Sequence, residues 1–133
     1  TLMVVISLEQ RHVGQALQAL TAVAGMQTGA SMYRYYIAVD DDIDPVDLKQ
    51  VIWAMCTRVD PAESVQIIKS WTSDLDPRLP PEKREKGDFT MSRMLIDACK
   101  PFVWRDRFAL ANKFSSDKRE EIWEKWAPKL RLK

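Results

Sequence analysis

Residues 33–61 decide the fold, and they read YRYYIAVDDDIDPVDLKQVIWAMCTRVDP. The run at residues 34–39 is rich in aromatic and apolar side chains, which is typical of a buried strand, and three acids at residues 40–42 follow it. Asp44 precedes a proline, and this pair matches the N-cap and first position of a helix ending near Arg58. The segment therefore predicts a strand, an acidic turn and a capped helix. In α/β proteins, ligands bind near such carboxyl ends of strands.

The expected helix at residues 44–58 carries apolar side chains at helical spacing. Such a stripe normally packs against the core. We therefore expect the following residues to form its buried face: Val46, Leu48, Ile52, Met55 and Cys56.

The alternation of strand and helix extends through the rest of the chain. Residues 2–8 (LMVVISL) form a continuous apolar run, which predicts a strand buried on both faces, and residues 10–25 have helical spacing. Further strands are expected at residues 64–71 and 94–96, and a last helix at 117–126. This pattern predicts a three-layer α/β domain with about four strands in a mainly parallel sheet, flanking helices and a C-terminal helical arm.

Two segments stand outside this rhythm. Residues 72–90 are rich in proline and charge, which predicts a mobile surface loop. We divide the chain into an α/β domain at residues 1–112 and a helical arm at 113–133. Trp123 and Trp126 fall on one face of the arm, where they either pack in the core or contact a partner subunit.

Composition limits the class of protein. The chain has 133 residues, of which 46% are hydrophobic and 29% charged, with a net charge of +1. These values are typical of one soluble domain and give no strong field for nucleic acid. No apolar run reaches the ~20 residues of a membrane span. The chain begins without Met and almost within an apolar run, so we expect a piece of a longer cytoplasmic protein.

Several common sites are excluded by their missing residues. Cys56, Cys99 and the single His12 cannot supply a tetrahedral zinc site, and we expect free, buried cysteines. A calcium loop starting at Asp40 needs Gly and Glu where Pro45 and Val51 stand. The acids then form either a solvated turn with a helix cap or a structural element beside a ligand. The chain also lacks the glycines of a dinucleotide fingerprint and the serine elbow of a hydrolase.

Three motifs, taken in order, resemble the carboxyl-terminal domain of UbiD-type decarboxylases. The segment at residues 39–61 resembles the family pattern of a strand, two or three acids, a helix bearing VxWA and a closing T-R-x-D-P. Residues 12–16 resemble its P-G-H-A segment, with Val13 in place of proline. RMLIDACKP at residues 93–101 resembles its strand ending in D-A-T-x-P, with Cys99 in place of threonine. The resemblance covers about residues 4–102.

The resemblance implies a carboxy-lyase, which removes or adds carbon dioxide on an aromatic or other unsaturated acid or its thioester. It implies prenylated flavin mononucleotide, made by a flavin prenyltransferase, as the cofactor that serves as electron sink. The catalytic residues, metal ligands and potassium site of the family come from upstream domains. This chain would then be a lid and oligomerisation domain, inactive alone, that forms a homo-oligomer through its last helix.

The resemblance also assigns roles to single residues. The family has a lysine that reaches the flavin phosphate, and Arg34 stands in its place and keeps the charge. Ile37 matches a residue of the pocket wall. Ser73, Asp74 and Leu75 resemble the loop that closes over the substrate, with Leu75 as an apolar gate. Two alternatives stay open: a stand-alone α/β binding module without cofactor, and an assembly module that acts only through the last helix.

Overall fold

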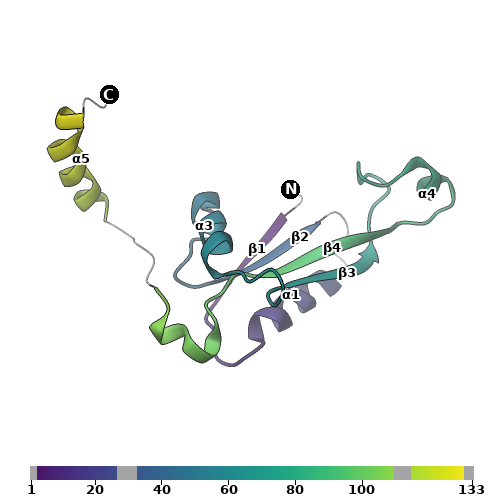
Figure 1. Ribbon diagram of the computed structural model, residues 1–133. Helices are drawn as coiled ribbons and strands as arrows, with labels where there is room; N and C mark the ends of the chain where they lie inside the picture. Colours follow the sequence, from purple (N-terminus) through teal and green to yellow (C-terminus); the bar gives the residue numbers. More distant parts are fainter. Residues whose placement is uncertain (1–2, 27–32, 110–114, 131–133) are drawn as a thin grey trace.

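The computed structural model describes residues 3–26, 33–109 and 115–130. Figure 1 shows a sheet with one helix on each face, a long hairpin at one end and a helix standing apart near the carboxyl terminus. In chain order the elements are β1 Met3–Leu8, α1 Gln15–Gly25, β2 Tyr35–Asp40, α3 Leu48–Arg58, β3 Val65–Trp71, α4 Pro81–Glu85, β4 Thr90–Asp97, the 3-10 helix η1 Phe102–Arg107 and α5 Ser116–Leu130.

The sheet has four strands in the order β1-β2-β4-β3. β1 and β2 pair in parallel, and so do β2 and β4, with Ile37 opposite Val5 and Ile96. β3 and β4 form an antiparallel hairpin with Ile67 opposite Met94. The sheet is mixed and mostly parallel, and the predicted α/β class is confirmed. β1 is an edge strand. Its side chains pack against the clusters on both faces of the sheet, as expected, but most of them are only half-buried.

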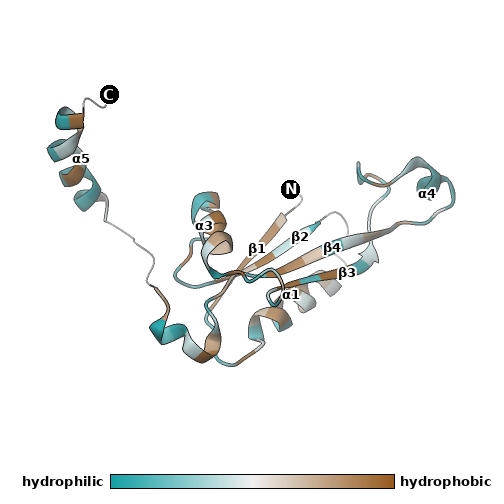
Figure 2. Cartoon of the chain, in the orientation of Figure 1, coloured by the Kyte–Doolittle hydropathy of each residue, from teal (hydrophilic) through white to brown (hydrophobic). Residues whose placement is uncertain are grey.

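Two hydrophobic clusters hold the three layers together. On one face α1 packs Ala16, Leu20 and Ala24 against Tyr36 and Leu95. The opposite face forms the second cluster, where α3 and the turn before it pack on the sheet: Ile37, Val39, Ile43, Val51, Ala54, Ile96 and Ala98. Alternate side chains of β2 point to opposite faces, and this strand therefore supplies both clusters. Figure 2 shows the apolar colour concentrated in the strands and the hydrophilic colour in α4.

Helix α3 begins later than the sequence predicted. Asp47, not Asp44, is its N-cap, and the Asp47 carboxylate accepts hydrogen bonds from the backbone N–H groups of Lys49 and Gln50. Asp44 instead accepts from the N–H of Val46 in the preceding turn. Both aspartates suit a cap chemically, and the tight turn after the acids decides between them.

The buried face of α3 also differs from the expected stripe. Val51, Ala54 and Arg58 face the sheet. Four of the expected residues are exposed and Met55 is partly buried, so the predicted face was wrong for most of its members: Val46, Leu48, Ile52 and Cys56. The helix therefore turns an apolar face outward. The expected burial of Cys56 is likewise contradicted, whereas Cys99 is buried and both cysteines are free.

The segment between β3 and β4 is more structured than the predicted loop. Helix α4 forms its far part, and the N–H of Thr72 donates to the carbonyl of Phe89 at 2.8 Å, which continues the hairpin. Asp76 and Leu79 are buried. Near the other end of the chain, α1 begins only after Gly14, whose φ of 80° lies in the left-handed region that favours glycine.

Helix α5 stands apart from the sheet in Figure 1. Its first turn is capped by Ser115, whose hydroxyl accepts a hydrogen bond from the N–H of Lys118. Trp123 and Trp126 are about half exposed, so within the described residues they do not pack in the core of the α/β layers. No helix among the described residues is long and apolar enough to span a membrane.

Candidate functional site

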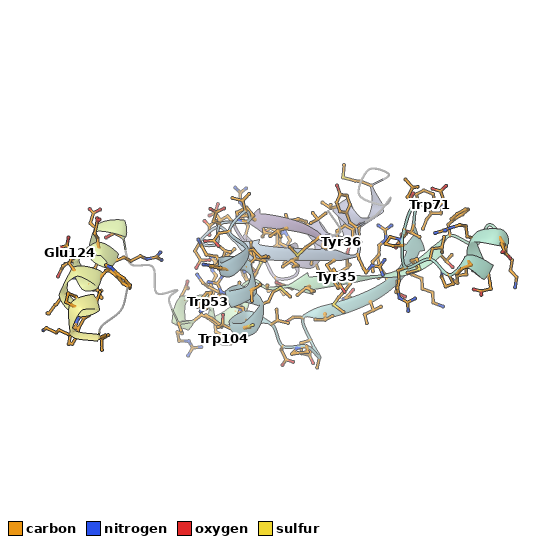
Figure 3. The ribbon with its side chains drawn as sticks, turned by 90° about the horizontal axis from the view of Figure 1, so that it is seen from above. Tyr35, Tyr36, Trp53, Trp71, Trp104 and Glu124 are labelled. Carbon is orange, nitrogen blue, oxygen red and sulfur yellow. The ribbon has the colours of Figure 1, made fainter. Side chains whose placement is uncertain are left out.

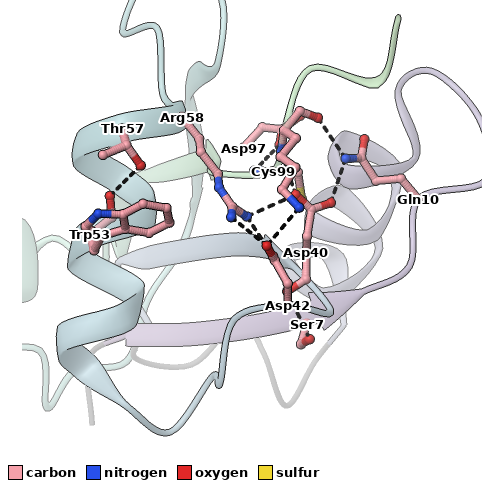
Figure 4. A network of polar contacts seen from close by, with 10 residues as sticks. Ser7, Gln10, Asp40, Asp42, Trp53, Thr57, Arg58, Asp97 and Cys99 are labelled. Atoms are coloured by element: carbon pink, nitrogen blue, oxygen red, sulfur yellow. Dashed lines mark hydrogen bonds and ion pairs between the residues drawn. The ribbon is translucent and has the colours of Figure 1, made fainter. Parts of the chain in front are cut away.

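Two polar sites lie at opposite ends of β2. At the carboxyl end, the Arg58 guanidinium is fully buried between two carboxylates (Figure 4). Its Nη1 donates to Asp40 Oδ2 at 3.1 Å and to Asp42 Oδ1 at 2.9 Å, and its Nη2 donates to Asp42 Oδ2 at 2.8 Å. The Trp53 ring lies 5.2 Å from the guanidinium carbon. The forked geometry holds the end of α3 against the end of β2.

Two other segments contribute donors to the same carboxylates. The backbone N–H of Lys100 donates to Asp40 Oδ2 at 2.6 Å, and the Lys100 ammonium lies 2.8 Å from Asp42 Oδ2. The side-chain amide of Gln10 donates to Asp40 Oδ1 at 2.7 Å. Burial opposes ionisation of Asp42, but hydrogen bonds from Arg58 and Lys100 outweigh it and lower its pKa to about 2.

The acidic turn is therefore neutralised within the domain. The expectation of a solvated turn was wrong for Asp40, which is buried, whereas Asp41 is exposed. The described residues contain no group of three or more side chains arranged to hold a metal ion. Burial also raises the pKa of the Cys99 thiol, which therefore stays protonated and is a poor nucleophile. This end of the sheet holds a structural ion-pair network.

The amino end of β2 opens on a groove of about 480 Å³. The groove runs beside β2, β4, β3 and the segment before α4. Its lining contains five cationic residues and no acid: Arg34, Lys69, Arg78, Lys83 and Arg93. In a chain with a net charge of +1, this segregation gives the groove lining an excess of positive charge.

Asp76 connects Arg34 to residues 73–78, which begin with the predicted substrate-closing loop and which we call the lid segment. Arg34 Nη2 donates to Asp76 Oδ1 at 2.6 Å, and the Thr72 hydroxyl donates to Asp76 Oδ2 at 2.8 Å. The N–H of Arg78 donates to Asp76 Oδ1 at 2.9 Å. Burial opposes ionisation of Asp76, yet the donors of Arg78, Thr72 and Arg34 lower its pKa. The start of β2 and the start of the lid segment are therefore one hydrogen-bonded unit.

The structure places the remaining predicted site residues unevenly. Leu75 is 74% exposed at the tip of the lid segment, and the hydroxyl of Ser73 accepts from its N–H at 3.1 Å. Ser73 also donates to the Asp74 carboxylate at 3.1 Å. Ile37 is buried in the cluster under α3 and is therefore not beside the groove. Arg34 and the Ser73–Leu75 segment are thus brought together, and Ile37 is not.

Sequence reasoning missed several polar residues of these two sites. Arg58 had a signal, because it falls on the same helical face as Val51 and Ala54, where a charge requires a buried partner. Arg93 lies on a buried strand position and donates to the Tyr36 hydroxyl at 2.6 Å and to the carbonyl of Trp71. No local sequence pattern marks Lys69 and Arg78 as site residues, because only the folding of the hairpin brings them to one groove.

Comparison with known proteins identifies the family. The model of the 3-octaprenyl-4-hydroxybenzoate carboxy-lyase C-terminal domain matches residues 1–98. The chain belongs to the UbiD C-terminal domain family. A phenolic acid decarboxylase of Streptomyces sp. (strain D7) is 38% identical over 104 residues, which cover 75% of this chain and 20% of that protein.

Solved UbiD-class structures share the fold. Vanillic acid decarboxylase of Sedimentibacter hydroxybenzoicus in its open form aligns with a TM-score of 0.71 at 28% identity, over 99% of this chain and 27% of that one. The UbiD-class enzyme HmfF of Pelotomaculum thermopropionicum, in complex with FMN, aligns with a TM-score of 0.70 at 30% identity, over 87% and 24%. The chain spans about a fifth of the length of the curated relatives it matches. It is homologous to the carboxyl-terminal part of UbiD-class decarboxylases.

Proposed function

We propose that this chain is the lid and oligomerisation domain of a decarboxylase or carboxylase that acts on an aromatic or other unsaturated acid, or its thioester. The observation that carries the proposal is the acid-free cationic groove beside Arg34, in a chain of the UbiD family. The decarboxylase activity of the relatives and the FMN bound to HmfF support it.

The residues around Arg34 fit the phosphate of prenylated FMN. The guanidinium has five N–H donors, and one nitrogen contacts Asp76 while the side chain is 22% exposed. Among the described residues Asp76 contacts only one guanidinium nitrogen, so donors remain for an anion in a groove whose lining residues include no acid. When bound, the prenylated flavin would supply the electron sink that decarboxylation needs. Arg34 would hold the phosphate by charge-assisted hydrogen bonds, and Asp76 would orient Arg34.

The lid segment would control access to the reacting centre. Leu75 is an exposed apolar side chain next to a hydrogen-bonded anchor, and closing it over a substrate would exclude water. Ser73 and Asp74 would hold the backbone of the lid segment in place through their hydrogen bonds. Ile37 would act from below, as part of the packed wall beneath the site, and not as a direct contact.

The remaining parts of the enzyme would come from the same polypeptide and its copies. Upstream domains would supply the catalytic residues, the metal and the potassium site, so this chain alone would be inactive. A flavin prenyltransferase would provide the cofactor in the cytoplasm. The exposed tryptophan face of α5 would join subunits in a homo-oligomer. The same face favours the second candidate, an assembly module without catalysis.

The decisive experiment uses the longer polypeptide that carries this chain. We expect the protein produced together with a flavin prenyltransferase to retain flavin and to release carbon dioxide from a panel of aromatic and unsaturated acids. Protein produced without the prenyltransferase serves as the control and should be inactive. A polypeptide with flavin but no turnover or carboxylate exchange on any acid would favour the assembly module.

A further inference from the structure

The groove at the amino end of β2 holds more cations than one flavin phosphate requires. Arg34 is paired with Asp76, and Lys83 contacts Asp88 at 3.2 Å. Lys69 and Arg78 differ from them. Within the described part of the chain, neither the Lys69 ammonium nor the Arg78 guanidinium has a side-chain or carbonyl partner. Two cations without a charge partner among the described residues therefore line the groove.

One row of the groove lining, which we call its floor, is apolar. Tyr35, Met94 and Ile67 stand opposite one another across three strands, on the face that α3 covers further along the sheet. Ser92 and Lys69 form the next row. Tyr35 is 43% and Ile67 68% exposed, because α3 packs only on the other half of this face. Figure 3 shows Tyr35 near the middle of the sheet and Trp71 toward the α4 end.

We propose that the groove binds a substrate that carries a phosphate ester or phosphoanhydride in addition to its reacting group. This inference rests on the proposed function and names the substrate class. The apolar floor would contact the organic part of the substrate, and Lys69 and Arg78 would bind its phosphate. A volume of about 480 Å³ lies within the range of roughly 300–1,000 Å³ that small-molecule sites occupy.

A doubly charged phosphate fits the lining better than a carboxylate does. The groove combines a guanidinium fork, which binds phosphate through two parallel hydrogen bonds, with a mobile ammonium point charge. Arg78 belongs to the lid segment, since its N–H is bonded to Asp76, whereas Lys69 lies on β3. A phosphate held by both would therefore connect the lid to the sheet when substrate is present.

The test uses inorganic pyrophosphate as the probe and the longer polypeptide as the protein, both with and without flavin. The key variant is Lys69→Gln/Arg78→Gln. Lys86→Gln is the matched control, because Lys86 is an exposed cation of the same hairpin that does not line the groove. We expect calorimetry to show salt-sensitive binding that weakens about tenfold or more in the double variant and stays unchanged in the control.

Flavin occupancy is the second measurement, and it should be the same in all three proteins. No pyrophosphate binding, or equal binding in the double variant, would overturn the proposal. Loss of flavin from the double variant would overturn it too, because Lys69 and Arg78 would then serve the cofactor. Lower thermal stability with unchanged pyrophosphate binding would assign the groove to an acidic segment of the upstream polypeptide. Absence of flavin from the wild-type protein would contradict the proposed function alone, since the groove can be titrated without flavin.

Discussion

Arg58 shows how a single buried charge organises this domain. Its guanidinium joins β2 and α3 through Asp40 and Asp42, and Lys100 joins the chain after β4 to the same acids. Removing one partner from a buried pair typically costs 3–5 kcal/mol, because the other charge stays buried without compensation. The network therefore sets where α3 ends relative to the sheet, and within the described residues the charges of Asp40 and Asp42 are compensated by the domain itself.

We expect the domain to lose stability in acid through Asp42. Its pKa of about 2 lies below the unfolded value of about 3.9, so Asp42 stabilises the fold above pH 4 and loses this effect as the pH falls toward 2. Asp42→Asn should lower the free energy of unfolding by about 2 kcal/mol at pH 7. Urea unfolding at several pH values measures the difference, which should vanish near pH 2.

A neighbouring carboxylate provides the control for this experiment. Asp41→Asn changes an exposed acid of the same turn and should leave the pH dependence unchanged. Burial raises the pKa of Asp97, so its contribution has the opposite sign, but it is common to both proteins and cancels in the comparison. A difference between wild type and Asp42→Asn that does not depend on pH would contradict the assignment.

Arg34 is the residue that we expect to retain the cofactor. A charge-assisted contact to phosphate is worth about 1.5–3 kcal/mol, so Arg34→Ala should weaken flavin retention about tenfold or more in the longer polypeptide. Arg34→Lys keeps the charge and should retain most of the flavin. Flavin content per protein after identical purification is the measurement. Full flavin occupancy in the Arg34→Ala variant would contradict the assignment of Arg34 to the cofactor site.

At the level of elements, the first residue of α3 is set by a local hydrogen-bonding choice between two aspartates. Its N-cap lies at Asp47 because this carboxylate reaches two backbone N–H groups. Asp47→Ala should lower the melting temperature by roughly 4 °C, since a lost cap destabilises a helix end. Asp44→Ala removes a single turn hydrogen bond and should have a smaller effect. A larger loss in Asp44→Ala, measured by thermal unfolding, would restore Asp44 as the cap.

The β3–β4 hairpin is the element that makes the groove. Antiparallel pairing places Lys69 opposite Ser92, and the continuation of the hairpin brings Arg78 to the same groove. Asp76 fixes the base of the lid segment through Arg34 and Thr72. Residues 72–90, which the sequence predicted as a mobile surface loop with a substrate-closing part at residues 73–75, thus also contribute Arg78 and Lys83 to the groove.

For the molecule as a whole, α5 and the outward face of α3 expose large apolar side chains to solvent. Trp53 and Trp104 lie at the opposite end of the sheet from Trp71 in Figure 3. The exposed tryptophans of α5, 54% and 46% accessible, are large apolar groups of the kind that dominate subunit interfaces.

We expect Trp123→Ala/Trp126→Ala to reduce the oligomeric state of the longer polypeptide and leave the sheet folded. Each tryptophan can bury roughly 200 Å² against another subunit, which is lost in the variant. Light scattering gives the mass of the assembly, and circular dichroism reports the fold. Glu124→Ala, on the same helix, should keep the wild-type mass. An unchanged mass in the double variant, with lower thermal stability, would place both rings in packing within one subunit.

The sequence by itself determined the α/β class, the four strands, the approximate helices and the family. These follow from local periodicity and from ordered motifs, which need no knowledge of distant contacts. Through the resemblance it also named Arg34 and the segment at Ser73 to Leu75 as site residues. The structure links them through Asp76, and their roles stay predictions. The free state of both cysteines was likewise expected.

Only the tertiary structure decided which side of each element is covered. The apolar residues of α3 allow two faces. The buried one packs Val51 and Ala54 in the hydrophobic cluster and pairs Arg58 with the acids after β2. The antiparallel direction of β3, and with it the groove, depends on strand pairing across a long connection. Periodicity reports which residues can be buried, whereas burial itself depends on neighbours that are distant in the sequence.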